Sequence, residues 1–265
     1  VSVRLNLSAE GYQSNSATIT LRSSGRTDAQ VFLVRGNEGV SGSESGNNSG
    51  VIDGSGVLLQ SFRTQTSPNP ANQAEGAVSV PAGTHGSTST GDSATGQLQA
   101  AVVYYTANTP STAVAFPGGF QVPVQTLGGS LEETTMTTAG FMTVTVTDES
   151  GRQITRFDPP IELSMEIEPG TLNRQTGNPV QSGDDISFFS YDDDSGIWME
   201  EGEAQLTGPG DDGNFLASFL TQHLTTWSAG YTDSGCSSGA FTIQRNGNTG
   251  SISARAFSAS GGWFG

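Results

Sequence analysis

The sequence predicts an all-β protein, and three observations support this. Glycine accounts for 36 of the 265 residues, and serine and threonine supply much of the rest, which is typical of short strands joined by turns. Alternation of apolar and polar residues, the pattern of a half-buried strand, begins at Val1 and recurs along the chain. Good helix formers are scarce and Gly, Ser or Thr interrupts every long window, so no helix of ordinary length is expected.

Residues 1–66 are expected to form a first, antiparallel β module. Alternation puts four apolar side chains on the face that should be buried: Val1, Val3, Leu5 and Leu7. Further strands are expected at residues 17–21, 31–34 and 56–62, whereas residues 41–50 are almost pure Gly, Ser and Asn and should be a loop. A Pro- and Asn-rich segment at 67–75 interrupts the pattern, so we expect a linker there.

Residues 76–231 are expected to form a second module with longer strands. Strands are expected at 76–81, 96–105 and 141–147, and in the last of these Met142, Val144 and Val146 alternate with threonines. The clearest alternation directs Ile161, Leu163, Met165 and Ile167 inward and Glu162, Ser164, Glu166 and Glu168 toward water. A hairpin follows at 186–191 and 197–203, and a further strand at 215–220. Antiparallel strands with one buried face predict a β-sandwich.

Residues 232–265 are interpreted as a β-prone tail. They contain two weak strand patterns, at 241–244 and 252–257. Near the end are Trp263 and Phe264, two large apolar residues that a free tail would leave exposed. Such apolar residues favour docking into a groove or onto a strand edge, either of the first module or of a neighbouring copy. Both alternatives stay open. Cys236 is the single cysteine, so an intrachain disulfide is excluded, whereas a bond to a second chain is not.

The charge of the chain excludes one class of partner. All ten basic residues are Arg, against 26 acidic residues, which gives a formal net charge of −16. A surface this acidic repels nucleic acid, which is bound through basic contacts that release counterions. Residues 93–131 carry no formal charge, but Gly, Pro, Thr and Asn interrupt them too often for a membrane span.

The acidic residues suggest a weak calcium site, although no cofactor is expected. The candidate ligands are Asp184, Asp185, Asp192, Asp193 and Asp194. An EF-hand needs acids at alternate positions, a central Gly and flanking helices, whereas strands are expected on both sides here. The better interpretation of residues 192–196 is a hairpin turn, in which Asp and Ser form local hydrogen bonds and Gly196 adopts a positive φ.

One series of features carries a family resemblance. Tyr191 is followed by the acidic turn, by Trp198 and by Glu200-Glu201-Gly202, and residues 223–227 then read His-Leu-Thr-Thr-Trp. Together with the earlier strands, residues 76–231 resemble the β-sandwich module of cartilage intermediate layer protein and many bacterial extracellular proteins. More distantly, they are similar to the ZU5 and GAIN domains. Leu224 and Ser228 depart from the pattern, because relatives usually have an aromatic residue and an Asn there.

The resemblance implies a candidate self-cleavage site at His223, Leu224 and Thr225. The Thr225 hydroxyl would attack the Leu224 carbonyl while His223 accepts the hydroxyl proton, and water would then hydrolyse the resulting ester. This chemistry also requires backbone strain. The alternative is that His223 and Trp227 are packing residues of the sandwich.

These observations lead to a functional hypothesis with two alternatives. We expect a non-enzymatic extracellular or cell-surface structural protein that acts through protein–protein contact with itself or other surface proteins, in adhesion or as a fibre subunit. Asn6 and Asn47 are candidate glycosylation sites. The alternatives are a self-cleaving domain and a carbohydrate-binding module. The aromatic residues Tyr104, Tyr105, Trp198, Trp227 and Trp263 could form a sugar platform, although most of them are expected in the core.

Overall fold

The computed structural model confirms the all-β prediction. Strands make up most of the described residues, and very few of those residues are helical. The structure describes residues 2–9, 12–20, 31–35, 44–67, 74–107, 110–233, 256–257 and 263–264. Within these ranges no helix has the length and hydropathy needed to cross a bilayer. The single helix among the described residues, α1 (Pro110–Ala115), has only six residues.

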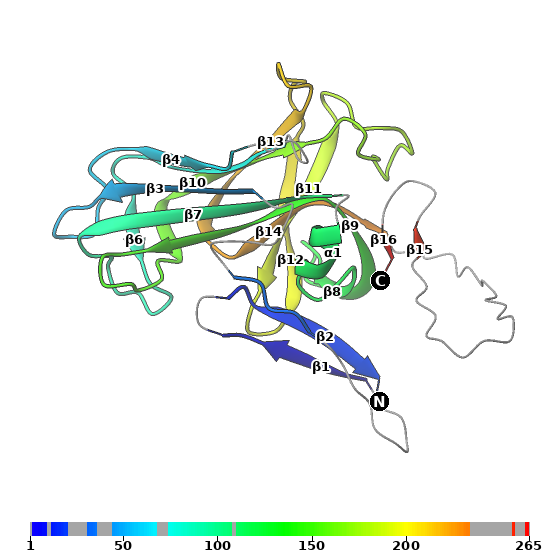
Figure 1. Cartoon of the computed structure of the whole chain (residues 1–265), viewed down its shortest axis with the longest axis horizontal. Coiled ribbons are helices and arrows are strands. Elements are labelled where there is room, and N and C mark those ends of the chain that lie inside the picture. Colours follow the sequence, from blue (N-terminus) through cyan, green and yellow to red (C-terminus); the bar gives the residue numbers. More distant parts are fainter. Residues whose placement is uncertain are drawn as a thin grey trace, which may run out of the picture.

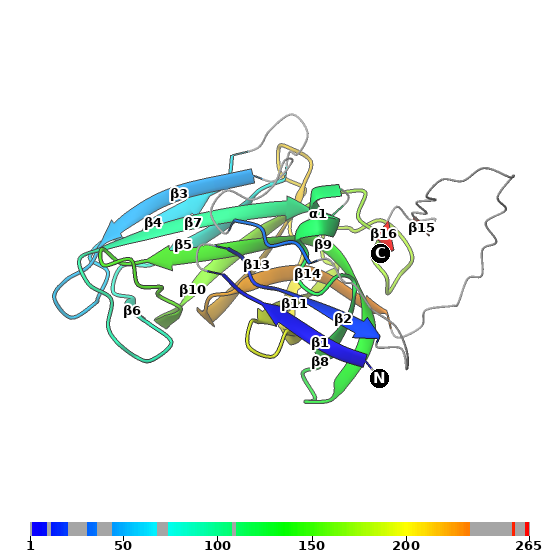
Figure 2. The ribbon, with the colours of Figure 1, turned by 60° about the horizontal axis from the view of Figure 1, so that its bottom comes forward.

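Two sheets pack face to face (Figures 1 and 2). The smaller sheet has the order β13 (Phe215–His223), β10 (Arg156–Ile167), β5 (Gly76–Val80) and β4 (Phe62–Gln65), and β6 (His85–Ser87) also pairs with β10. The larger sheet has the order β14 (Thr226–Asp233), β11 (Asp185–Asp192), β12 (Ile197–Gln205), β8 (Gln121–Gln125), β9 (Leu131–Thr147), β7 (Gln97–Thr106) and β3 (Glu44–Val51). Pairing is antiparallel except between β8 and β12.

The main core lies between the two sheets and follows the alternation in the sequence. From the smaller sheet, Ile161, Leu163, Met165 and Ile167 of β10 are fully buried. Met142, Val144 and Val146 of β9 pack against them from the larger sheet. Each such side chain contributes roughly 1.5–3 kcal/mol by leaving water. The predicted inward face of residues 161–167 is therefore confirmed.

The larger sheet curls at one end and has a second buried cluster on its other face. β14 pairs with β9 as well as with β11, so the pairings of β9, β14, β11, β12 and β8 close into a ring. Alternate residues of the same strand therefore enter two different cores. Phe188 of β11 belongs to the main core between the sheets, and Phe189 belongs to the second cluster. The second cluster includes Phe116, which follows α1 and stacks on Trp198 with ring centroids 4.8 Å apart.

The predicted division into two modules at 67–75 is wrong for residues 44–66. β3 pairs with β7 over its whole length, and β4 pairs with β5 directly across the predicted linker. Ile52 and Leu58, between β3 and β4, belong to the main core. The segment between β4 and β5 is thus a connection inside one sheet, because the residues on both sides bury their apolar side chains in the same core.

The Gly- and Asn-rich segment that was expected to be a loop forms the edge strand β3. Its glycines allow close contact with the other sheet. A Cβ on Gly46 would lie 1.8 Å from the carbonyl oxygen of Gln65, so a side chain there cannot fit. Two further expected strands differ from the structure: residues 31–34 have no assigned strand, and in the 56–62 segment the strand begins only at Phe62. The glycines of this segment therefore allow β3 to pack tightly against β4, and they do not indicate that a strand is absent.

Candidate functional site

The N-terminal hairpin forms a separate two-stranded sheet beside the turn between β11 and β12 (Figures 1 and 2). It consists of β1 (Ser2–Leu7) and β2 (Asn15–Thr20). The strand was predicted correctly, but the direction of its faces was wrong. Polar residues face the sandwich: the Asn6 amide donates to the carbonyl oxygen of Asp194 at 2.9 Å, and Arg4 contacts the Tyr191 side chain. The Arg4 guanidinium also donates to the Ser16 hydroxyl of β2 at 2.8 Å, within the hairpin.

The apolar face of this hairpin is turned to solvent. Val3 pairs with Ile19 and Leu5 pairs with Ala17, so these four residues share one face, which we name the hairpin face. Val3 is 37% exposed and Leu5 is 42% exposed. The expectation that this alternation would bury Val3 and Leu5 fails because the curled sheet offers the hairpin polar partners.

The connection between β1 and β2 returns to the sandwich and borders a groove. Gln13 is buried, its amide donates to the Ala115 carbonyl at 2.9 Å, and its carbonyl oxygen accepts from the Thr143 hydroxyl at 3.1 Å. Asp193 borders the groove beside Ser14. Burial raises the pKa of Asp193 to about 6, although a hydrogen bond from Ser14 opposes the shift. Gln13 and Ser14 are therefore fixed at one end of the groove.

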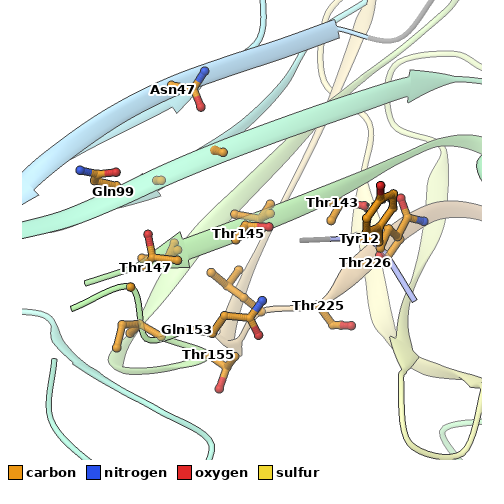
Figure 3. A pocket seen from close by; sticks show the side chains of 18 of the residues that line it. Tyr12, Asn47, Gln99, Thr143, Thr145, Thr147, Gln153, Thr155, Thr225 and Thr226 are labelled. Carbon is orange, nitrogen blue, oxygen red and sulfur yellow. Dashed lines mark hydrogen bonds between the residues drawn. The ribbon is translucent and has the colours of Figure 1, made fainter. Parts of the chain in front are cut away.

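The groove has a volume of about 990 Å³, and its floor is the outer face of β3, β7 and β9 (Figure 3). Asn47 projects from β3, Gln99 from β7, and Thr145 and Thr147 from β9. Gln153 and Thr155, after the turn that follows β9, and residues 224–226 before and at the start of β14 form another border. The groove floor and the second buried cluster therefore lie on the same face of the larger sheet, and the second cluster is nearer the end that curls.

A polar cluster holds the turn at 148–152 next to this groove. The buried Asp148 accepts from the Arg152 guanidinium at 2.7 Å and from the Thr95 hydroxyl at 3.1 Å. Burial raises the pKa of Asp148, but these hydrogen bonds outweigh burial and lower it to about 2. Arg152 also donates to the Ser93 carbonyl. These bonds fix the turn that precedes Gln153.

His223 and Thr225 are not hydrogen-bonded to each other in the part of the chain that the structure describes. The His223 Nε2 atom lies 3.3 Å from Glu201 Oε1, and this hydrogen bond lowers the pKa of Glu201. The Thr225 hydroxyl donates to the Tyr191 carbonyl at 2.6 Å. No non-Gly residue in the described ranges has a positive φ. His223 is thus not placed as the proton acceptor for Thr225, and no positive φ marks backbone strain at these described residues, so the geometry that self-cleavage requires is not assembled here.

The acidic candidates for calcium cannot form one site. Asp184 and Asp185 lie at the beginning of β11, whereas Asp192 to Asp194 lie at its end, so about 24 Å of strand separates the two groups. The Asp192 carboxylate accepts from the Asp194 and Ser195 backbone and from the Ser195 hydroxyl. Gly196 has a φ of 70°. The hairpin-turn interpretation is therefore confirmed, and the combined calcium site is wrong. Within the described ranges, no three His, Cys, Asp or Glu side chains gather as a metal site.

The other candidate residues lie at three different places. Asn47 is exposed at the groove, whereas the Asn6 amide is bonded to Asp194. Trp263 and Phe264 form β16 (Trp263–Phe264), which pairs with β15 (Ala256–Phe257), while Cys236 and the remaining tail lie outside the described residues. The aromatic residues Tyr104, Tyr105, Trp198 and Trp227 are at most 1% exposed. They are core residues, as expected, and cannot form a sugar platform.

The sequence interpretation missed the groove floor. The apolar half of the alternation at 141–147 predicts only that Met142, Val144 and Val146 enter the core. The residues that alternate with them, Thr143, Thr145 and Thr147, all line the groove. Gln97 and Gln99 on β7 also line it, so the polar half of each alternating pattern contained the signal.

Comparison with known proteins gives no relative from which a function could be transferred. No family model matches the chain, and neither the curated proteins nor the solved structures yield a match. The resemblance of residues 76–231 to the cartilage intermediate layer protein module and to ZU5 and GAIN domains therefore stays a prediction.

Proposed function

We propose that this chain is a non-enzymatic structural protein of the cell surface or the extracellular space, which acts through protein–protein contact as a fibre subunit or in adhesion. The observation that carries the proposal is the hairpin face. Val3 and Leu5 are exposed there although apolar surface is worth about 25 cal/mol per Å² when it is buried. A partner that covers this face would gain that stabilisation.

The backbone of the hairpin offers a second means of contact. β1 and β2 pair only with each other among the described residues, so each strand has one edge without a strand partner there. A two-stranded sheet is marginally stable by itself, and a third strand with an apolar face would stabilise it. Strand addition supplies main-chain hydrogen bonds for affinity and side-chain contacts on alternate residues for specificity.

We assign the C-terminal segment of a second copy as the occupant of this face. Residues 234–265 contain Arg245 and Arg255 and no acidic residue, so they carry a formal charge of +2 in a chain whose other residues sum to −18. This charge complementarity favours docking of the tail onto an acidic body. The 22 residues at 234–255 span up to about 70 Å when extended, far enough to reach a neighbour. Repeated head-to-tail docking without closure produces a fibre.

The composition supports an extracellular location. The chain has no lysine and only ten arginines, so trypsin-like proteases find few sites. Asn47, a candidate glycan acceptor, is exposed on β3. Both features suit a protein that persists outside the cell.

Sedimentation velocity and negative-stain electron microscopy test the proposal under reducing conditions, which remove any contribution from Cys236. The full chain should form concentration-dependent oligomers. Deletion of 237–265 and the Leu5→Asp variant should both give monomers with unchanged melting temperature. Leu220→Asp is the matched control, because Leu220 is 69% exposed on β13 and lies outside the hairpin face. It should assemble like the unmodified chain.

Two results would contradict the proposal. A full chain that stays monomeric at every concentration would exclude self-assembly through the hairpin face. A monomeric deletion variant with a lowered melting temperature would show that the tail completes its own fold instead of docking onto a neighbour.

A further inference from the structure

The groove on β3, β7 and β9 has the chemistry of a binding site that is separate from the hairpin face. Polar side chains lie in rows across the three strands (Figure 3). One row contains Ser49, Gln99 and Thr147, and the next contains Asn47 and Thr145, with Ala101 between them. Thr143 to Thr147 extend the floor over about 13 Å along β9.

The groove side chains have hydrogen-bonding capacity that the fold does not use. Gln99, Thr145, Thr147 and Gln153 make no side-chain hydrogen bond within the described part of the chain, and Gln99 and Gln153 are exposed. A side-chain amide or hydroxyl group can both donate and accept hydrogen bonds. A ligand with many hydroxyl groups presents the same two functions, so it can pair with every position of this floor.

The charge of the groove restricts the class of ligand. Among the described residues that line it, Asp193 is the single charged side chain and no Arg is present, although the whole chain carries −16. An anionic polymer would find no cationic partner there and would be repelled by the rest of the surface. One carboxylate is too little to select a cation. A neutral ligand is not repelled by the acidic surface and needs no cationic partner in the groove.

One aromatic ring is available at the rim. Tyr12 is 42% exposed and lies at the end of the groove that the connection between β1 and β2 borders. An aromatic ring offers an apolar face together with a polar hydroxyl group. Such a ring suits the C–H face of a sugar, and the larger buried aromatic residues of this chain are not available for that role.

We propose that this groove binds a neutral glycan, with Gln99, Thr145, Thr147 and Gln153 as hydrogen-bonding floor and Tyr12 as the stacking residue at its end. The proposal does not depend on fibre formation. A module that contacts a protein through its hairpin face and a polysaccharide through its groove could join the two.

Native affinity electrophoresis in gels that contain a soluble neutral polysaccharide tests the inference. The probes are β-glucan, xylan, galactomannan and dextran, with alginate as the anionic comparison. The protein should be produced in a bacterial cytoplasm, so that no glycan on Asn47 fills the groove of its own chain. At least one neutral polymer should retard the protein, independently of salt, and alginate should not.

Variants then assign the retardation to the groove. The double variant Gln99→Leu/Thr145→Val keeps side-chain size and removes two hydrogen-bonding groups, so affinity should fall about tenfold or more. Tyr12→Ala should also weaken binding. The control Gln222→Leu/Thr137→Val makes the same chemical changes outside the groove lining and should bind normally.

Three results would overturn the proposal. They are the absence of retardation by any neutral polymer, equal binding of the groove and control variants, and stronger binding to alginate than to the neutral polymers. A melting curve for each variant shows that the comparison is made between folded proteins. None of these results depends on the oligomeric state, so the failure of this inference and of the fibre proposal can be distinguished.

Discussion

Strands β10 and β1 have the same alternation of apolar and polar residues, but the apolar face is buried in β10 and exposed in β1. In β10 the apolar residues Leu163 and Met165 are fully buried between two sheets. In β1 the apolar residues Val3 and Leu5 face solvent, while Asn6 on the opposite face donates a hydrogen bond to Asp194 of the sandwich. Alternation thus predicts that a strand has two different faces, but the neighbouring elements decide which face is covered.

The largest effect is expected from truncation of the β10 face. Leu163→Ala should lower the free energy of unfolding by about 3 kcal/mol, because it leaves a cavity in a close-packed core. Leu5→Ala provides the matched comparison and should change it by less than about 0.5 kcal/mol. Urea denaturation of the monomer, followed by tryptophan fluorescence, measures both. Equal losses would mean that the hairpin face is buried in the monomer.

A smaller loss is expected where β3 contacts β4. Gly46→Ala should destabilise by about 2 kcal/mol, since the new methyl group would collide with the backbone of Gln65 and force the two edges apart. Ser45→Ala, at the exposed neighbouring position, is the control and should be nearly neutral. If both variants melt at the temperature of the unmodified chain, the edges of the two sheets are not in close contact.

The outward face of β10 should make stability depend on pH. Burial raises the pKa of Glu166 to about 7, hydrogen bonds from the Glu75 backbone and Asn214 oppose the shift, and the charges of Asp212 and Glu75 add to it. The raised pKa means that the fold favours the protonated form. This contribution is complete below pH about 4.5 and is lost as the pH rises through about 7.

Glu166→Gln should remove this dependence. The Gln carbonyl oxygen can still accept the hydrogen bonds that Glu166 accepts from Glu75 and Asn214. Because Glu166 is only half-buried, the variant should gain about 1 kcal/mol relative to the unmodified chain at pH 8 and nothing at pH 4. Chemical denaturation at the two pH values checks this. An equal difference at both values would show that the Glu166 charge is not the cause.

The same difference between strands limits what can be predicted from the sequence alone. The strands of the second module were predictable because both β10 and β9 bury the face that their alternation marks. The role of residues 44–66 was not predictable, because β3 gains its position from the close approach that Gly46 permits and not from an apolar pattern. The groove floor was present in the sequence as Thr143, Thr145 and Thr147, but only the register of β9 with β7 brings it beside Gln99.

Hydrogen–deuterium exchange of the hairpin amides, measured as a function of protein concentration, tests the central claim of a protein-binding hairpin face most directly. We predict that protection of residues 2–7 and 15–20 rises with protein concentration in the full chain and does not rise after deletion of 237–265. Exchange of β10 serves as the internal reference and should stay constant. Protection of the hairpin that is independent of concentration, and unchanged by the deletion, would contradict the proposed contact between copies.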